Sequence, residues 1–331
     1  MQSEITVSLP KYLQEEETVS RECQDLISTL PKEKGWLTSH LYKYQGFWYT
    51  ARYLQGTIYC QNHFQAQDSD ILLVTTPKSG TTWLKAVIFT LVNRTRFPIG
   101  KNHHLNSQNP HDLVPFLEIK LFPETQNPDF SSFSKPRIFA THLPYTSLPE
   151  TLKKDCQCKL VYLCRNPKDI FVSLWQFTNR LKPPGAQTNT IQDVLDKFCQ
   201  GVSLFGPVWE HVLQYWNFSK ENHNRLLFLK FEDMKEHPGI QLRRLAEFLG
   251  CPFSQEEQNS GLVEDILEIC SFKHLSSLEI NRNGKLASGE ENSTFFRCGT
   301  IGDWKNHLTT EMAERVDRIT EEKLDSSGLT L

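Results

Sequence analysis

Short apolar runs alternate along the chain with longer segments in which apolar residues recur at helical spacing. Runs flanked by polar or turn-forming residues predict buried strands, and these runs are 71–74, 137–140, 158–164 and 226–229. Apolar residues at helical spacing predict helices, and these segments are 20–30, 81–91, 170–177, 194–198, 209–216, 242–249, 263–270 and 312–324. Such alternation predicts an α/β fold, with a mostly parallel sheet covered by helices on both faces.

Three polar segments interrupt this pattern. Residues 1–19 are acidic and contain Pro10, which is typical of a loose leader before a single domain over 20–331. Residues 94–110 are rich in turn-forming residues, and loops of this length are usually mobile or functional. Residues 273–293 are polar and contain glycines, so we expect a flexible lid or loop there.

Basic residues follow several of the predicted strands. The four strands lead, in order, to Lys78, His142, Arg165 and Phe231. In a parallel sheet the carboxyl ends of the strands lie at one edge, and ligands bind there. We therefore expect these residues to gather at one binding site.

The loop after the first strand has the features of an anion-binding site. Pro77 and Gly80 end the strand pattern, and a helix begins near Thr81 or Thr82. Free N–H groups at a helix N-terminus, Lys78 and the hydroxyls nearby suit a phosphate. The lysine precedes the glycine, whereas the loop that binds nucleoside triphosphates has Gly-Lys order, which argues against a small-molecule kinase. A plain strand–helix connection is the alternative interpretation.

Composition limits the other classes of function. The chain has 331 residues, 38% of them hydrophobic, which suits one large domain. A net charge of -3 argues against a protein that coats nucleic acid or an anionic membrane, so an anion site would be a small cleft. The sequence has no signal-peptide pattern and no long apolar span, and its nine cysteines lack metal-ligand spacing. We expect a cytoplasmic protein in a reducing compartment, with no membrane segment.

Three segments resemble, in the right order, the motifs of the cytosolic sulfotransferases. Residues 77–83 (PKSGTTW) resemble the loop that binds the 5′-phosphosulfate of 3′-phosphoadenosine 5′-phosphosulfate (PAPS). Residues 162–173 (YLCRNPKDIFVS) resemble the strand and helix that bind its 3′-phosphate, and residues 296–306 (FRCGTIGDWKN) the glycine-rich segment that closes over it. The similarity runs from about Leu30 to Leu329.

Two further stretches are similar to the plant branch of this family, namely 30–36 (LPKEKGW) and 109–115 (NPHDLVP). The resemblance implies transfer of a sulfuryl group from PAPS to a hydroxyl of a small plant metabolite, without a metal. It also implies that Lys78 stabilises the leaving phosphate and that His142 is the general base, a role that suits an ordinary histidine pKa. Ser173 would restrain Lys78 until the acceptor arrives.

The resemblance assigns the nucleotide to residues from all three motifs. Arg165 and Ser173 would hold the 3′-phosphate together with Arg297, and Trp83 and Phe272 would sandwich the adenine. The whole implied set is Lys78, Ser79, Gly80, Thr81, Thr82, Trp83, Arg165, Ser173, Phe231, Phe272, Arg297, Cys298 and Gly299.

Aromatic residues are the candidates for the acceptor pocket, partly by resemblance. They are Phe47, Trp48, Tyr49, Phe116, Tyr145 and Phe177. The dense aromatic cluster at 47–49 has a second interpretation, because such rings fill a core wherever they are buried. Flavonols, hydroxyjasmonate and brassinosteroids all suit a flat or greasy pocket.

Three positions depart from the family pattern. Cys298 stands where the family often has lysine, Phe231 where it often has tyrosine, and Ala140 where animal members carry lysine. Cys298 and Phe231 leave a different hypothesis open, a protein that binds PAPS with little or no turnover. Near the C-terminus Thr310 replaces the valine of a dimer-contact pattern, so monomer and weak dimer both stay open.

Overall fold

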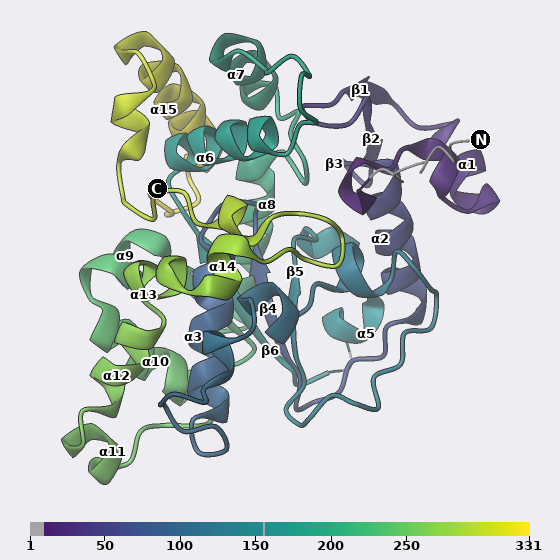
Figure 1. Ribbon diagram of the computed structural model, residues 1–331. Helices are drawn as coiled ribbons and strands as arrows, with labels where there is room; N and C mark the ends of the chain where they lie inside the picture. The colour runs from purple at the N-terminus through teal and green to yellow at the C-terminus, as the bar shows by residue number, and fades with distance from the viewer. Residues whose placement is uncertain (1–9, 155) are drawn as a thin grey trace, which may run out of the picture.

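Four parallel strands form the central sheet, in a computed structural model that describes residues 10–154 and 156–331 (Figure 1). The strands are β4 (Ile71–Thr75), β5 (Ile138–Thr141), β6 (Lys159–Cys164) and β7 (Leu226–Lys230). They lie in the order β5-β4-β6-β7, and in the register Leu73 pairs with Ala140 on one side and with Val161 on the other. The four predicted strands and the α/β class with a parallel sheet are confirmed.

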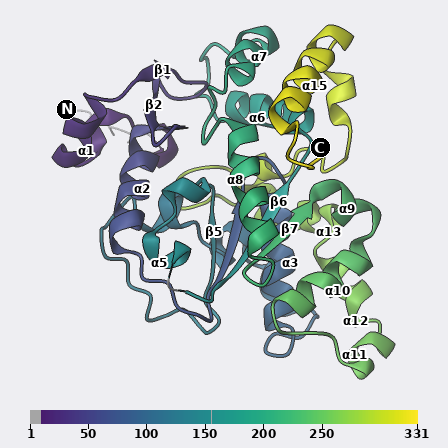
Figure 2. The same ribbon diagram turned by 180° about the vertical axis from the view of Figure 1, so that it is seen from behind.

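Helices cover both faces of this sheet. Side chains alternate along a strand, so Leu72 and its neighbour Leu73 belong to two different apolar clusters. Helix α3 (Thr81–Asn93) packs into the cluster of Leu73, and α8 (Val208–Glu221) packs into the cluster of Leu72. Accordingly α3 lies in front of the sheet in Figure 1, and α8 lies in front of it in the reverse view of Figure 2.

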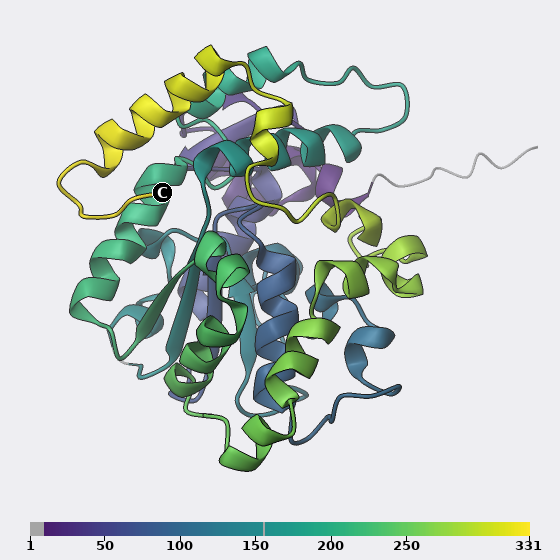
Figure 3. The same cartoon turned by 90° about the vertical axis from the view of Figure 1, so that its left-hand side faces the viewer.

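The other helices surround this core. They are α1 (Arg21–Ile27), α2 (Ala51–His63), α4 (Pro110–Leu113), α5 (Glu150–Lys153), α6 (Pro167–Arg180), α7 (Ile191–Cys199), α9 (Phe231–Glu236), α10 (Pro238–Phe248), α11 (Gln255–Asn259), α12 (Leu262–Ile269), α13 (Phe272–Ser277), α14 (Glu279–Asn283) and α15 (Thr310–Leu324). Helix α15 packs against α6, α7 and α8, and Figure 3 shows it along one end of the molecule. Every segment predicted to be helical contains a helix.

A small antiparallel sheet was not predicted. It consists of β1 (Lys32–Lys34), β2 (His40–Tyr44) and β3 (Phe47–Tyr49). Strands of three to five residues are too short to display a clear period of two, and the aromatic residues in them are typical of a core and of a pocket alike.

The segment 273–293 is not simply a flexible loop. It contains most of α13, all of α14, and an isolated pairing of Lys285 with Glu291. Buried amide side chains explain its polarity, because Asn281 donates to the carbonyl of Leu275 at 2.9 Å and Asn292 donates to that of Ile280 at 2.8 Å. Polar residues that satisfy the backbone internally look like loop residues in a sequence.

Residues 10–19 of the predicted leader lie within the described structure and contact the rest of the chain. Residues 10–19 contain two 3₁₀ turns, Lys11–Leu13 and Glu16–Thr18, and the side chains of Leu13 and Val19 are buried. The N–H of Lys11 donates to the carbonyl of Ser288 at 3.0 Å, which ties this segment to the region of 286–290. Residues 1–9 of the predicted leader lie outside the described residues.

Candidate active site

A cavity of about 550 Å³ opens at the carboxyl edge of the central sheet. His142, Arg165 and Phe231 each follow directly after the last residue of a strand, and the loop after β4 enters between them. The gathering of basic residues expected at this edge is therefore present. The predicted site residues that line the cavity are Lys78, Gly80, Thr81, Thr82, Trp83, Phe116, His142, Arg165, Ser173, Phe177, Phe231, Phe272, Arg297 and Gly299.

Two residues of the predicted nucleotide set do not line the cavity with the others. The hydroxyl of Ser79 is buried and lies 2.6 Å from that of Thr76, so it stabilises the loop from within. The thiol of Cys298 lies 3.0 Å from the hydroxyl of Thr300. Arg165 and Arg297 both line the cavity.

The aromatic cluster at 47–49 fills the core and does not line the cavity. The ring of Phe47 packs edge-on against His211, and that of Tyr49 packs edge-on against Phe205. Trp48 belongs to a small apolar cluster with Leu41. Pairing of β3 with β2 places these rings against the interior, which favours the core interpretation of the cluster.

Tyr145, another predicted pocket residue, also lies away from the cavity. Its ring is 4.6 Å from that of Phe218 and 5.8 Å from that of Tyr215, both on α8. Of the predicted pocket aromatics, Phe116 and Phe177 are the two that line the cavity.

The loop 76–80 presents Lys78 to the cavity. Gly80 has a φ of +108°, and a Cβ there would lie 2.8 Å from the ring of Phe231, so a side chain does not fit. The Nζ of Lys78 lies 3.9 Å from the ring centroid of Phe177. Burial, followed by the charges of Arg297 and Arg165, lowers the pKa of Lys78 to about 7.

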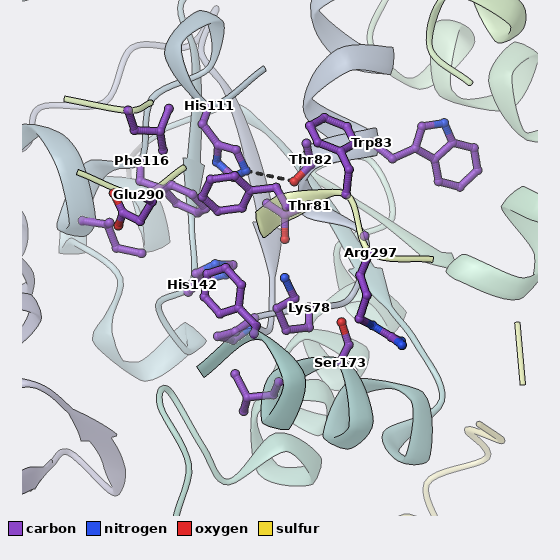
Figure 4. A pocket seen from close by; sticks show the side chains of 18 of the residues that line it. Lys78, Thr81, Thr82, Trp83, His111, Phe116, His142, Ser173, Glu290 and Arg297 are labelled. Carbon is purple, nitrogen blue, oxygen red and sulfur yellow. Dashed lines mark hydrogen bonds between the residues drawn. The ribbon is translucent and has the colours of Figure 1, made fainter. Parts of the chain in front are cut away.

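The ring of His142 is fixed in one tautomer. Its Nδ1 lies 2.6 Å from the carbonyl oxygen of Thr75, which can only accept, so Nδ1 carries the hydrogen and Nε2 is left as the acceptor. Burial lowers the pKa of His142 to about 3, so the ring is neutral near pH 7. Figure 4 shows His142 and Lys78 next to each other in the cavity wall.

Glu118 is a residue of this site that sequence reasoning missed. It is fully buried on a short π-helical segment, Leu117–Leu121, and its carboxylate accepts from the backbone N–H of His142 at 2.7 Å and from the hydroxyl of Thr141 at 2.8 Å. Burial raises the pKa of Glu118 to about 7. An acidic residue between the apolar Leu117 and Ile119 is the signal that the sequence offered.

Lys85 and His111, which lie behind the loop 76–80, are also residues that the sequence analysis did not predict. Lys85 is fully buried on α3, and its Nζ lies 3.1 Å from Nδ1 of His111. The other ring nitrogen, Nε2, lies 2.9 Å from the hydroxyl of Thr82, as Figure 4 shows. Burial lowers the pKa of both Lys85 and His111 well below their usual values. These contacts orient the hydroxyl of Thr82 at the cavity wall.

Unpaired donors lie beside the cavity where an anion would be bound. The buried Nε atoms of Arg165 and Arg297 have no hydrogen-bond partner within residues 10–154 and 156–331. The hydroxyl of Ser173 also has none among the described residues. The Nη groups of Arg165 donate to the carbonyls of Lys78 and Thr300, and Arg297 pairs with Asp303, so both guanidinium groups are held in place. Guanidinium groups can only donate, and a phosphate oxygen is a suitable acceptor for them. The donor set therefore fits a phosphate group.

Flat surfaces lie on the same side of the cavity. The rings of Trp83 and Phe231 meet edge to face, with centroids 5.6 Å apart. Gly299 has a φ of +69°, and a Cβ there would lie 2.5 Å from the ring of Phe272. The backbone at Gly299 thus leaves no room for a side chain against this ring, and the aromatic faces that line the cavity suit a planar group such as a nucleobase.

The fold and this site define the class of the protein. Residues 68–328 match the family model of the sulfotransferase domain, so the chain belongs to the sulfotransferases and is an enzyme of that class. Within the class it is a member of the plant cytosolic sulfotransferases. It is 49% identical to cytosolic sulfotransferase 12 of Arabidopsis thaliana over 97% of each chain, and 50% identical to cytosolic sulfotransferase 6 of the same plant, over 94% of this chain and 95% of the relative.

Solved structures support the same assignment. The crystal structure of a sulphotransferase from Arabidopsis thaliana is 44% identical, with a TM-score of 0.75, and covers 98% of this chain and 100% of its own. The crystal structure of mouse sulfotransferase SULT7A1 complexed with PAP is 29% identical, with a TM-score of 0.67, and covers 87% of this chain and 95% of its own. The predicted family is confirmed.

Neither a membrane-spanning helix nor a metal-binding cluster is present within residues 10–154 and 156–331. None of the helices there has the length and apolar character needed to cross a membrane. Among the same described residues, no group of three or more His, Cys, Asp or Glu side chains is arranged to hold a metal ion.

Proposed function

We propose that this sulfotransferase uses PAPS as its donor and a hydroxyl of a small plant metabolite as its acceptor. The complex of the similar mouse enzyme with PAP, the desulfated form of this donor, supports the choice of nucleotide. Since the relatives are named cytosolic, we further propose that the protein acts in the cytoplasm.

Arg165, Arg297 and Ser173 are proposed to hold the 3′-phosphate. The unpaired Nε atoms of the two arginines and the free hydroxyl of Ser173 support this role, because a phosphate would satisfy all three. The departure at Cys298 removes a cation that the family often has there, but the two arginines at the cavity remain. Trp83 and Phe272 are proposed to enclose the adenine.

The loop of Lys78 is proposed to hold the other end of the donor. When bound, PAPS supplies a sulfuryl group attached to a phosphate leaving group. Lys78 donates to the phosphate oxygen on which charge builds, together with the N–H groups at the start of α3. The pKa of Lys78, lowered to about 7 in the free protein, would rise next to this anion, so the residue is charged when it is needed.

His142 is proposed to take the proton of the acceptor hydroxyl. The single observation that carries this step is the bond between its Nδ1 and the carbonyl of Thr75, because it leaves the lone pair of Nε2 free. The low pKa keeps the ring neutral, and an anionic donor nearby would raise it and so make the ring a stronger base. Glu118 holds the backbone of His142 in place through its N–H.

The test measures both sulfuryl transfer to an acceptor and binding of the nucleotide. Purified protein with radiolabelled PAPS and a panel of flavonols, other phenols, steroids and hydroxyjasmonate should give a sulfated product. The His142→Ala variant should lose at least about a hundredfold in kcat, the size expected for a general base. Its affinity for adenosine 3′,5′-bisphosphate, measured by calorimetry, should stay close to that of the wild type. Equal turnover by the variant would rule out His142 as the base.

A further inference from the structure

Glu290 is a buried carboxyl group of the cavity that the proposed reaction does not use. We propose that it selects the acceptor, by accepting a hydrogen bond from a second hydroxyl at the end remote from the hydroxyl that is sulfated. This inference rests on the proposed function and adds a substrate class to it. The preferred acceptors are then neutral molecules with at least two hydroxyls, one at each end.

The position of Glu290 assigns it to the acceptor half of the cavity. In Figure 4, Glu290 and Arg297 lie on opposite sides of His142 and Lys78. The nucleotide is proposed to lie on the side of Arg297, and the acceptor must bring one hydroxyl to His142. The rest of the acceptor therefore extends toward Glu290 and the neighbouring ring of Phe116.

The backbone around Glu290 is well defined. The N–H of Leu286 donates to the carbonyl of Glu290 at 2.9 Å, and the N–H of Gly289 donates to that of Leu286 at 2.9 Å. The bond from Lys11 to Ser288 ties this turn to the N-terminal segment. A carboxylate on such a fixed turn can discriminate between acceptors, because it has little freedom to move away from a poor one.

The carboxylate of Glu290 has room for another donor. Glu290 is only 7% exposed, and its carboxylate accepts from the hydroxyl of Ser288. Within residues 10–154 and 156–331 it has no ion pair. A carboxylate has several acceptor positions, and a buried one that lacks donors carries a free-energy cost, so a donor from the acceptor would be favourable.

Two phenols line the same end of the cavity. Tyr12 and Tyr53 both face it, and neither hydroxyl has a hydrogen-bond partner within residues 10–154 and 156–331. The bond from the N–H of Lys11 to the carbonyl of Ser288 brings the neighbouring Tyr12 to the turn of Glu290, and Tyr53 lines the same cavity. Burial, followed by the charge of Glu290, raises the pKa of both phenols. A hydroxyl both donates and accepts, so it can donate to Glu290 and accept from a phenol.

The charges nearby favour a hydroxyl over a charged group. Arg52 and Lys11 share the single carboxylate of Glu124, so these two cations and the carboxylates of Glu124 and Glu290 together carry no net charge. An acceptor carboxylate would meet the charge of Glu290. An ammonium group would instead meet Arg52, which acts on Glu290 as a positive charge, as Lys120 does. A neutral hydroxyl meets neither repulsion.

The experiment compares matched acceptors. Pairs of flavonols and of steroids should be used that differ only in the hydroxyl remote from the sulfated position. The wild type should favour the dihydroxy member by about tenfold or more in kcat/KM, and Glu290→Leu should lose about tenfold to hundredfold for that member alone. Glu290→Gln keeps one acceptor oxygen, so its kcat/KM for the dihydroxy member should lie between the values of the wild type and Glu290→Leu. Glu291→Leu is the matched control, because Glu291 is exposed and pairs with Lys285.

The outcomes separate this inference from the proposed function. Equal losses for both members of each pair, or none, would overturn the role of Glu290 while sulfation itself continues. Dependence on Glu290 that appears only with an amine in place of the hydroxyl would overturn the substrate class. If no acceptor is sulfated, the proposed function fails; binding of the same pairs to the complex with adenosine 3′,5′-bisphosphate still tests Glu290. Unchanged affinity for that nucleotide in each variant shows that the fold is intact.

Discussion

The carboxylate of Asp169 accepts a hydrogen bond from the backbone N–H of Gly302 at 2.8 Å. A second oxygen accepts from the N–H of Trp304 at 3.1 Å, and Asp169 is only 1% exposed. Asp169 lies on α6, four residues before Ser173, whereas Gly302 follows the segment that carries Arg297 and Gly299. One buried carboxylate thus ties together the two parts of the chain that we propose to hold the 3′-phosphate.

Replacement of Asp169 should therefore weaken nucleotide binding. Asp169→Asn keeps the shape of the side chain but exchanges an acceptor oxygen for a donor, so one of the two backbone N–H groups loses its partner. We expect affinity for adenosine 3′,5′-bisphosphate to fall about tenfold, or roughly 1.4 kcal/mol. Calorimetric titration measures this fall. Asp317→Asn, at an exposed carboxylate that pairs with Lys168, is the control and should bind like the wild type. Equal affinities in the two variants would contradict the role of Asp169.

A side chain at Gly299 should weaken nucleotide binding, because it would collide with the ring of Phe272. A Cβ at Gly299 would lie 2.5 Å from the ring of Phe272, and the φ of +69° adds strain. Gly299→Ala should displace the ring and reduce nucleotide affinity at least about tenfold. Gly261 has a φ of +79° with no atom near its own Cβ position, so Gly261→Ala carries the strain without the clash. If both variants bind the nucleotide equally, the ring of Phe272 does not form part of the site.

Nucleotide affinity should depend on pH through Lys78. Its pKa is about 7 in the free protein, and a bound phosphate raises it. Binding is therefore strongest below pH 7, where the residue is already charged, and weakens as the pH rises from 7 toward the higher pKa of the complex. At pH 8 binding should take up protons, which calorimetry in buffers of different ionisation enthalpy detects. Lys78→Met should abolish most of this uptake, and Ser173→Ala should retain it. Uptake that persists unchanged in Lys78→Met would assign it to another group.

The sequence predicted the parts of the site that depend on local pattern. His142 and Arg165 could be placed together because each follows an apolar run, and parallel strands end at a common edge. Glu118 could not be placed at the site from the sequence. Its contact with His142 joins residues 24 apart, and Glu118 lies on a π-helical segment. Trp48 was predicted to line the acceptor pocket but belongs to an apolar cluster. An aromatic residue is equally typical of a core and of a pocket, and only the pairing of β3 with β2 decides between the two positions.

The opposite edge of the sheet should matter for stability and not for catalysis. Arg137 and Asp70 precede β5 and β4, and the guanidinium donates twice to the carboxylate, with Nε 2.8 Å from Oδ1. Both side chains are buried, so removal of one partner leaves an uncompensated charge. Arg137→Met should lower the free energy of unfolding by about 3 kcal/mol, seen as a lower denaturant midpoint with an unchanged slope.

A double variant distinguishes the charge from the packing around it. Arg137→Met combined with Asp70→Leu removes both charges, so it should be more stable than Arg137→Met alone. Sulfation kinetics of the single variant should match the wild type below its unfolding transition, because the pair lies at the amino ends of strands whose carboxyl ends carry the site. A large fall in kcat with intact folding would mean that the two edges of the sheet are coupled. A double variant less stable than the single one would assign the stabilisation to packing of the two side chains.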